Sequence, residues 1–122
     1  MAKTILIVDD SASLRQVVSI SLKGAGYDVI EACDGRDALT KLDGRKIHLM
    51  ISDVNMPNMD GLSFVKAAKQ LPAYKFTPIV MLTTEASDAR KAAGQAAGAR
   101  AWIVKPFQPA TVLNAVSKLI LP

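Results

Sequence analysis

Cysteine, histidine and aromatic side chains are scarce in this chain of 122 residues. It has one cysteine, Cys33, and one histidine, His48, and aromatic residues make up 5% of it. A single cysteine cannot form an internal disulfide, and no set of cysteines and histidines is spaced to bind zinc. Nucleic-acid-binding surfaces combine basic runs with aromatic residues, and here no basic run exceeds two residues. These absences favour a protein of a reducing cytoplasm that does not bind nucleic acid.

Long apolar runs are also missing. No stretch approaches the ~18 apolar residues that a transmembrane helix needs, and Met1-Ala2-Lys3 leads directly into a strand-like segment without a signal pattern. We therefore expect a cytoplasmic protein that is neither exported nor inserted into a membrane. The length predicts one domain, because domains usually contain about 100 to 200 residues.

The net charge of +4 is unevenly distributed along the chain. Residues 1–61 contain 7 basic and 9 acidic residues, whereas residues 62–122 contain 8 basic and 2 acidic residues. The basic residues of the second half are spread singly or in pairs, which is typical of solvated helix faces.

Short apolar segments and helical patterns alternate along the chain. Strands are predicted at 4–8, 28–32, 47–52, 78–82 and 101–104. Helices are predicted from Ser11 or Ser13 to Gly24 or Gly26, over 35–42, after Asp60-Gly61, from Ser87 to Gly98, and from Pro109 onward. The first, third and fourth strands are almost entirely apolar, as parallel strands covered on both faces are. The alternation predicts an α/β fold, a doubly wound (βα)5 sandwich with a five-stranded parallel sheet.

Polar residues follow the predicted strands: Asp9-Asp10, Asp53, Thr83 and Lys105. Ligands of open α/β sheets bind at this carboxyl edge. If the strand order is 2-1-3-4-5, one of the orders known for doubly wound folds, the three aspartates converge. Three converging carboxylates repel one another unless a cation lies among them, and an all-oxygen site suits Mg²⁺.

The same residues also suit phosphoryl transfer, which depends on positioning and on neutralisation of charge. Asp53 could accept the phosphoryl group covalently. The alternative is that Asp9 or Asp10 caps the first helix and that Asp53 simply ends a strand. This alternative explains each residue alone better than it explains the set.

The chain resembles response-regulator receiver domains over essentially its whole length, and among them single-domain chemotaxis regulators of the CheY type. The resemblance rests on Asp9-Asp10, the 53–61 segment DVNMPNMDG, Thr83-Thr84 and Lys105-Pro106-Phe107. It implies a flavodoxin-like fold with strand order 2-1-3-4-5, of which CheY is itself an example. It also implies one receiver domain over 1–122 with no effector domain.

By this resemblance Asp53 is the phosphoacceptor. Asp10 binds Mg²⁺ directly, Asp9 binds it largely through water, and the Asn55 main-chain carbonyl is a further ligand, with Mn²⁺ as a substitute metal. Asp53 completes the metal site.

The resemblance also assigns roles beyond the metal. Lys105 and Thr83 contact the phosphoryl group, and the Lys105-Pro106 peptide bond is cis. Thr83 and Trp102 form the switch, although tryptophan departs from the smaller aromatic that is usual there. Asn55 and Glu85 border the path of the attacking water and tune hydrolysis.

The function implied is that of a bacterial two-component response regulator in chemotaxis. A histidine kinase donates the phosphoryl group, and a downstream protein such as the flagellar motor switch receives the signal. A phosphatase is a further expected partner, and the chain itself is expected to be a monomer. Such a domain is not an enzyme, although it takes part in its own phosphorylation and dephosphorylation. Two alternatives stay open: a phosphate sink or relay in another pathway, and a small aspartate-nucleophile phosphatase. The phosphatase is disfavoured because Asn55 stands where such enzymes carry a second acid.

Overall fold

The computed structural model describes residues 2–54, 56, 58–84, 92 and 98–120. The elements in chain order are β1 (Thr4–Val8), α1 (Ala12–Gly24), β2 (Asp28–Ala32), α2 (Gly35–Lys41), β3 (Leu49–Asp53), α3 (Gly61–Lys69), the 3₁₀ helix η1 (Pro72–Tyr74), β4 (Ile79–Thr83), β5 (Ala101–Val104) and α5 (Pro109–Leu119). The five strands pair in parallel in the order β2-β1-β3-β4-β5. The predicted fold class and strand order are therefore confirmed.

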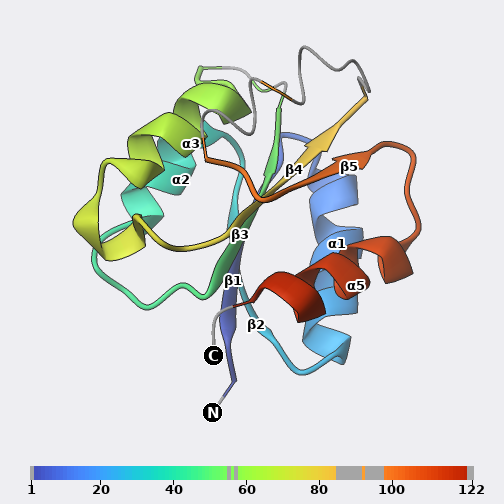
Figure 1. Cartoon of the computed structure of the whole chain (residues 1–122). Coiled ribbons are helices and arrows are strands. Elements are labelled where there is room, and N and C mark those ends of the chain that lie inside the picture. Colours follow the sequence, from blue (N-terminus) through green and yellow to red (C-terminus); the bar gives the residue numbers. More distant parts are fainter. Residues whose placement is uncertain (1, 55, 57, 85–91, 93–97, 121–122) are drawn as a thin grey trace.

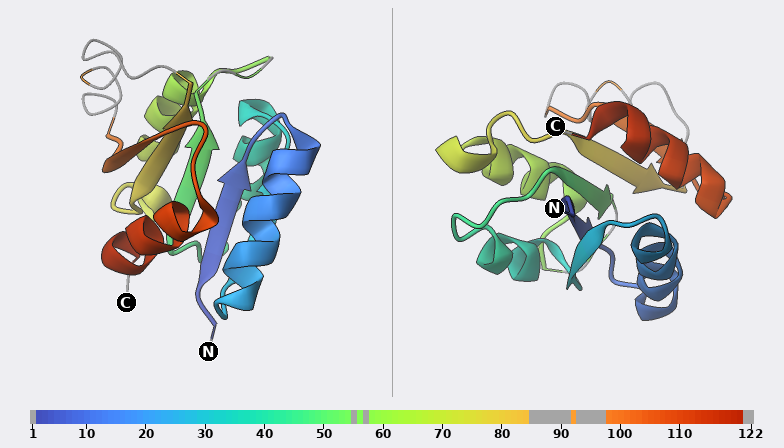
Figure 2. Two further views of the ribbon diagram at one scale, coloured as in Figure 1. Left: turned by 90° about the vertical axis from the view of Figure 1, so that its right-hand side faces the viewer. Right: turned by 90° about the horizontal axis from the view of Figure 1, so that it is seen from below.

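Helices cover both faces of the sheet (Figures 1 and 2). α2 and α3 lie on one face, and α1 and α5 lie on the other. Side chains alternate along a strand, so each central strand contributes to two cores. The core under α2 and α3 includes Leu6, Val8, Met50, Met81, Phe64 and Val65. The core under α1 and α5 includes Ile5, Ile7, Leu49, Ile51, Val18, Leu22, Val112 and Val116.

The three strands predicted to be covered on both faces are the central ones. All residues of β3 and β4 are buried, and in β1 only Thr4 is partly exposed. β2 and β5 form the sheet edges and keep partly exposed positions. The strands that were predicted from near-continuous apolar runs to be covered on both faces are thus the fully or almost fully buried ones.

Some element boundaries differ from the prediction. The third strand begins at Leu49 and not at residue 47, because Ile47 is buried without being part of the ladder, while His48 and Thr4 exchange hydrogen bonds. η1 was not predicted. The helix predicted from Ser87 to Gly98 lies, apart from residues 92 and 98, outside the described residues.

The helices α1, α2 and α3 each begin at a residue whose side chain accepts a hydrogen bond from the first turn of the helix. Ser11 caps α1 by accepting a hydrogen bond from the Leu14 N–H, which selects one of the two predicted starting points. Asp34 caps α2 and Asp60 caps α3 in the same way. No helix in the described ranges is long and apolar enough to cross a membrane.

Candidate functional site

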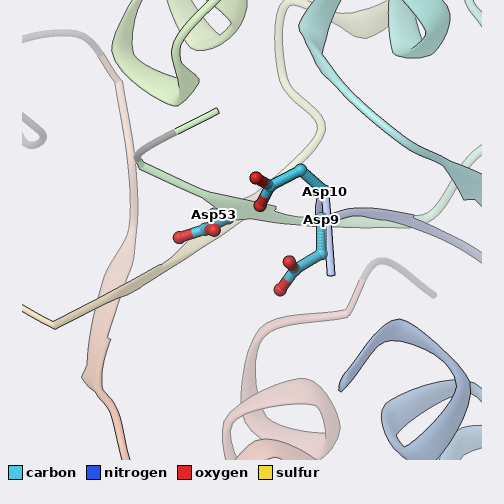
Figure 3. A group of neighbouring side chains, drawn as sticks. All are labelled: Asp9, Asp10 and Asp53. Carbon is cyan, nitrogen blue, oxygen red and sulfur yellow. The ribbon is translucent and has the colours of Figure 1, made fainter. Parts of the chain in front are cut away.

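Three aspartates meet at the carboxyl edge of the sheet. Asp9 and Asp10 directly follow β1, and Asp53 is the last residue of β3, the neighbouring strand. One carboxylate oxygen from each lies within 4.8 Å of the others, and Figure 3 shows the three side chains grouped around one space. The convergence expected from the strand order is therefore present. Neither Asp9 nor Asp10 caps α1, since that position belongs to Ser11.

The three carboxylates differ in exposure. Asp9 is 0% and Asp53 is 6% exposed, whereas Asp10 lies open to solvent. Burial and the adjacent Asp9 charge raise the pKa of Asp53 above its ordinary value, and Lys105 acts in the opposite direction. The site therefore combines two buried acids, which need a nearby positive charge, with one acid that solvent or a bound ion can reach.

Lys105 supplies positive charge from the other side of the site. Its Nζ lies 3.3 Å from Asp53 Oδ2 and 3.5 Å from Asp9 Oδ2. It follows β5 directly, and its main-chain N–H donates to the Thr83 carbonyl at 2.6 Å, which holds it to the end of β4. The Lys105-Pro106 peptide bond is cis, the isomer that the resemblance implied.

The other predicted site residues lie at the end of β4, within β5 or outside the described residues. Thr83 is the last residue of β4 and is 1% exposed. Trp102 lies in β5, partly buried against the core under α2 and α3. Asn55 and Glu85 lie outside the described residues.

Arg15 is a site neighbour that the sequence did not reveal. From α1, its Nη1 donates to the main-chain carbonyl of Asp9 at 2.6 Å, and its Nε pairs with Glu31 at 3.1 Å. Arg15 thus fastens the turn after β1 to β2. No sequence signal identifies this contact, because arginines on helices usually face solvent.

Gly61 is a second such neighbour. A Cβ at this position would lie 2.1 Å from the carbonyl oxygen of Asp53, and the Gly61 N–H donates to the Val54 carbonyl at 2.8 Å. Only glycine lets α3 begin this close to the end of β3. The Asp60-Gly61 pair predicted where the helix begins, but it did not predict that Gly61 lies so close to the Asp53 carbonyl.

The donor set fits a hard divalent cation. All three candidate ligands are carboxylates, and Mg²⁺ prefers oxygen ligands and keeps several waters. Asp10, the exposed member, is the ligand that such a hydrated ion can approach most readily.

Comparison with known families gives one match over most of the chain. The family model described as "Response regulator receiver domain" matches residues 5–117. The match includes all three aspartates, Thr83, Trp102 and Lys105.

Relatives and solved structures agree with this match. The chain is 41% identical to the chemotaxis protein CheY1 of Helicobacter pylori over 86% of each chain. It is also 41% identical to the alkaline phosphatase synthesis transcriptional regulatory protein PhoP of Bacillus subtilis, over 99% of this chain and 49% of that protein. A structure of the chemotaxis response regulator CheY4 of Vibrio cholerae is 50% identical, with a TM-score of 0.93, over 98% of this chain and 99% of that one.

Proposed function

Because the chain belongs to the family of response regulator receiver domains and is of the CheY type, we propose that it accepts a phosphoryl group on Asp53 with Mg²⁺ bound. Two-component signalling is the function of this family, whose members are signalling proteins and not classical enzymes. Chemotaxis is the pathway we propose, by similarity to the two chemotaxis proteins.

The observation that carries this proposal is the pairing of the clustered aspartates with Lys105. Asp53 is the carboxylate at the end of a central strand, and Lys105 Nζ lies 3.3 Å from one of its oxygens. Asp53 caps none of the described helices, so a structural role as a helix cap does not explain this buried carboxylate. A carboxylate held between a cation and an acidic metal site is suited to attack phosphorus.

The chemistry assigns one role to each side chain. An oxygen of Asp53 forms a bond to phosphorus while the bond from phosphorus to the donor's imidazole nitrogen breaks, and the imidazole leaves with that electron pair. Lys105 balances negative charge on the phosphoryl oxygens, and the Thr83 hydroxyl donates a hydrogen bond to one of them. Asp9, Asp10, Asp53 and the main-chain carbonyl of Asn55 would hold Mg²⁺, and the ion would supply further positive charge for phosphoryl transfer.

The signal passes to another protein in this proposal. A histidine kinase is the phosphodonor, and a downstream protein such as the flagellar motor switch binds the phosphorylated form. Thr83 and Trp102 form the switch, and Asn55 and Glu85 set the rate of hydrolysis.

The test is phosphorylation without a partner. The full chain is incubated with Mg²⁺ and acetyl phosphate, and its mass is measured for wild type, Asp53→Asn and Asp43→Asn. Asp43 is an exposed acid paired with Arg45 and serves as the matched control. We expect one phosphoryl adduct on wild type and on Asp43→Asn, and none on Asp53→Asn.

Two results would contradict the proposal. One is the absence of an adduct on wild type, and the other is an equal adduct on Asp53→Asn. Wild type treated with a chelator should also stay unmodified, because the reaction as proposed requires the metal.

A further inference from the structure

The loop between β3 and α3 is fastened to the start of α2. Asn58 Nδ2 donates to Asp34 Oδ2 at 2.7 Å, while the other Asp34 oxygen accepts from the Asp37 N–H at 2.8 Å as the cap of α2. Asp34 follows β2 and Asn58 follows β3, the two strands that flank β1. The Asn58–Asp34 contact therefore joins the segments that follow the two strands on either side of β1, the strand that leads to Asp9 and Asp10.

Several features fix the geometry of this contact. Asn58 has φ 66° and is, among the described residues, the one non-glycine residue with a positive φ. Asp34 is 8% exposed, and hydrogen bonds from Asp37 and Asn58 lower its pKa, so it stays an ionised acceptor. Met59 packs so closely on α2 that a Cβ at Gly35 would lie 2.8 Å from its Cγ.

The same loop is closed at its base. Val54 follows Asp53, and its carbonyl accepts the Gly61 N–H at 2.8 Å. The loop therefore leaves the site at Asp53 and returns at Gly61, with the Asn58–Asp34 contact between these two points. A loop held at its base and at a point in between loses less conformational freedom when a ligand binds beside it.

We propose that the Asn58–Asp34 contact is a positioning device: it fixes the point at which the chain returns from Asp53 toward α3, steadies the end of β3 that carries Asp53, and so increases the affinity for Mg²⁺. This inference rests on the proposed function, because it concerns the same metal site. Neither residue touches the metal; both act through the loop.

The first test removes the hydrogen bond without straining the backbone. Asn58→Gly keeps the positive φ, which glycine adopts freely, but removes the amide. Isothermal titration of the full chain with Mg²⁺ should show affinity at least about threefold weaker. We expect a smaller loss than the roughly 10- to 100-fold seen when a hydrogen-bond partner of a metal ligand is removed.

The second test exchanges the two side chains. Asn58→Asp alone places two carboxylates against each other and should weaken Mg²⁺ binding at least as much as Asn58→Gly. The double variant Asn58→Asp with Asp34→Asn restores one amide and one carboxylate, and aspartate tolerates the backbone of Asn58. We expect its Mg²⁺ affinity to return to within about twofold of wild type, because an exchanged pair can re-form the hydrogen bond.

The control destabilises the opposite end of the molecule. Tyr74→Phe removes a hydroxyl that accepts from the Gly44 N–H at 2.9 Å and donates to the Arg45 carbonyl at 2.8 Å. It should lower the thermal midpoint and leave Mg²⁺ affinity unchanged, so general destabilisation is separated from positioning.

The outcomes distinguish this inference from the proposed function. If wild type binds Mg²⁺ and Asn58→Gly binds it equally well, the positioning role is wrong while the proposed function stands. The same holds if the double variant binds as weakly as Asn58→Asp. If wild type does not bind Mg²⁺, both are overturned.

Discussion

At the scale of single residues, the positive charge of Lys105 offsets the negative charge of the carboxylates in the site. Its Nζ lies within 3.5 Å of both buried carboxylates, Asp9 and Asp53. A lysine ammonium is a compact cation that solvent reaches here only partly. Lys105 therefore stabilises the buried acids when no metal is present, and it repels a divalent cation that enters the same space.

Lys105→Met should reverse these two effects. Without Mg²⁺ the free energy of unfolding should fall by about 1 to 3 kcal/mol, less than the 3 to 5 kcal/mol of a fully buried pair, because Lys105 keeps some exposure. Mg²⁺ should bind about tenfold more tightly, since removing a unit charge near a divalent ion removes at least ~1.4 kcal/mol of repulsion. Urea unfolding and calorimetric titration measure the two quantities. Unchanged or weaker Mg²⁺ binding would show that Lys105 does not compete with the metal.

At the scale of elements, the start of α3 sets the position of the end of β3. The Gly61 backbone comes so close to the Asp53 carbonyl oxygen that a Cβ would lie 2.1 Å from it, and that carbonyl belongs to the proposed phosphoacceptor. A methyl group here must push the helix away from the strand or move Asp53.

Gly61→Ala should therefore lower both stability and phosphorylation. We expect a loss of about 1 to 3 kcal/mol in the free energy of unfolding, the usual cost of overpacking. The phosphoryl adduct from acetyl phosphate should form more slowly, because Asp53 is displaced from Lys105. Gly24→Ala is the matched control: Gly24 ends α1 with nothing within 4 Å of the added Cβ, so the change should be neutral or stabilising by up to ~1 kcal/mol. Equal behaviour of the two variants would contradict the packing argument.

The elements also show what sequence can predict and what it cannot. Apolar runs and helical spacing predicted the strands and helices, because these patterns report burial. The strand order that brings Asp9, Asp10 and Asp53 together came from known doubly wound folds and from the family resemblance, not from these patterns. The start of the third strand and the unpredicted η1 depend on which backbone groups pair, and periodicity does not encode this. The contacts of Arg15 with Asp9, and of Asn58 with Asp34, depend on loop conformation and could not be derived from residue types. Asn55, Glu85 and the helix predicted from Ser87 lie outside the described residues and stay predictions.

At the scale of the whole molecule, the site connects distant parts of the chain. Asp10 follows β1, Asp53 ends β3 and Lys105 follows β5, so the unfolded chain has no such site. A ligand that binds only the folded state stabilises all of it, by about 2.7 kcal/mol at a concentration 100 times its Kd.

Mg²⁺ should therefore raise the thermal midpoint of the whole protein. With about 2.1 cal/mol/K of unfolding entropy per residue, a gain of 2.7 kcal/mol corresponds to roughly 10 °C for a chain of this length. Scanning calorimetry at several Mg²⁺ concentrations, with ionic strength held constant by NaCl, measures the shift. Asp10→Asn is the matched control, because this exposed carboxylate contributes little to stability by itself, yet its loss should abolish most of the shift. A shift of the same size in Asp10→Asn would place the stabilising metal away from the three aspartates.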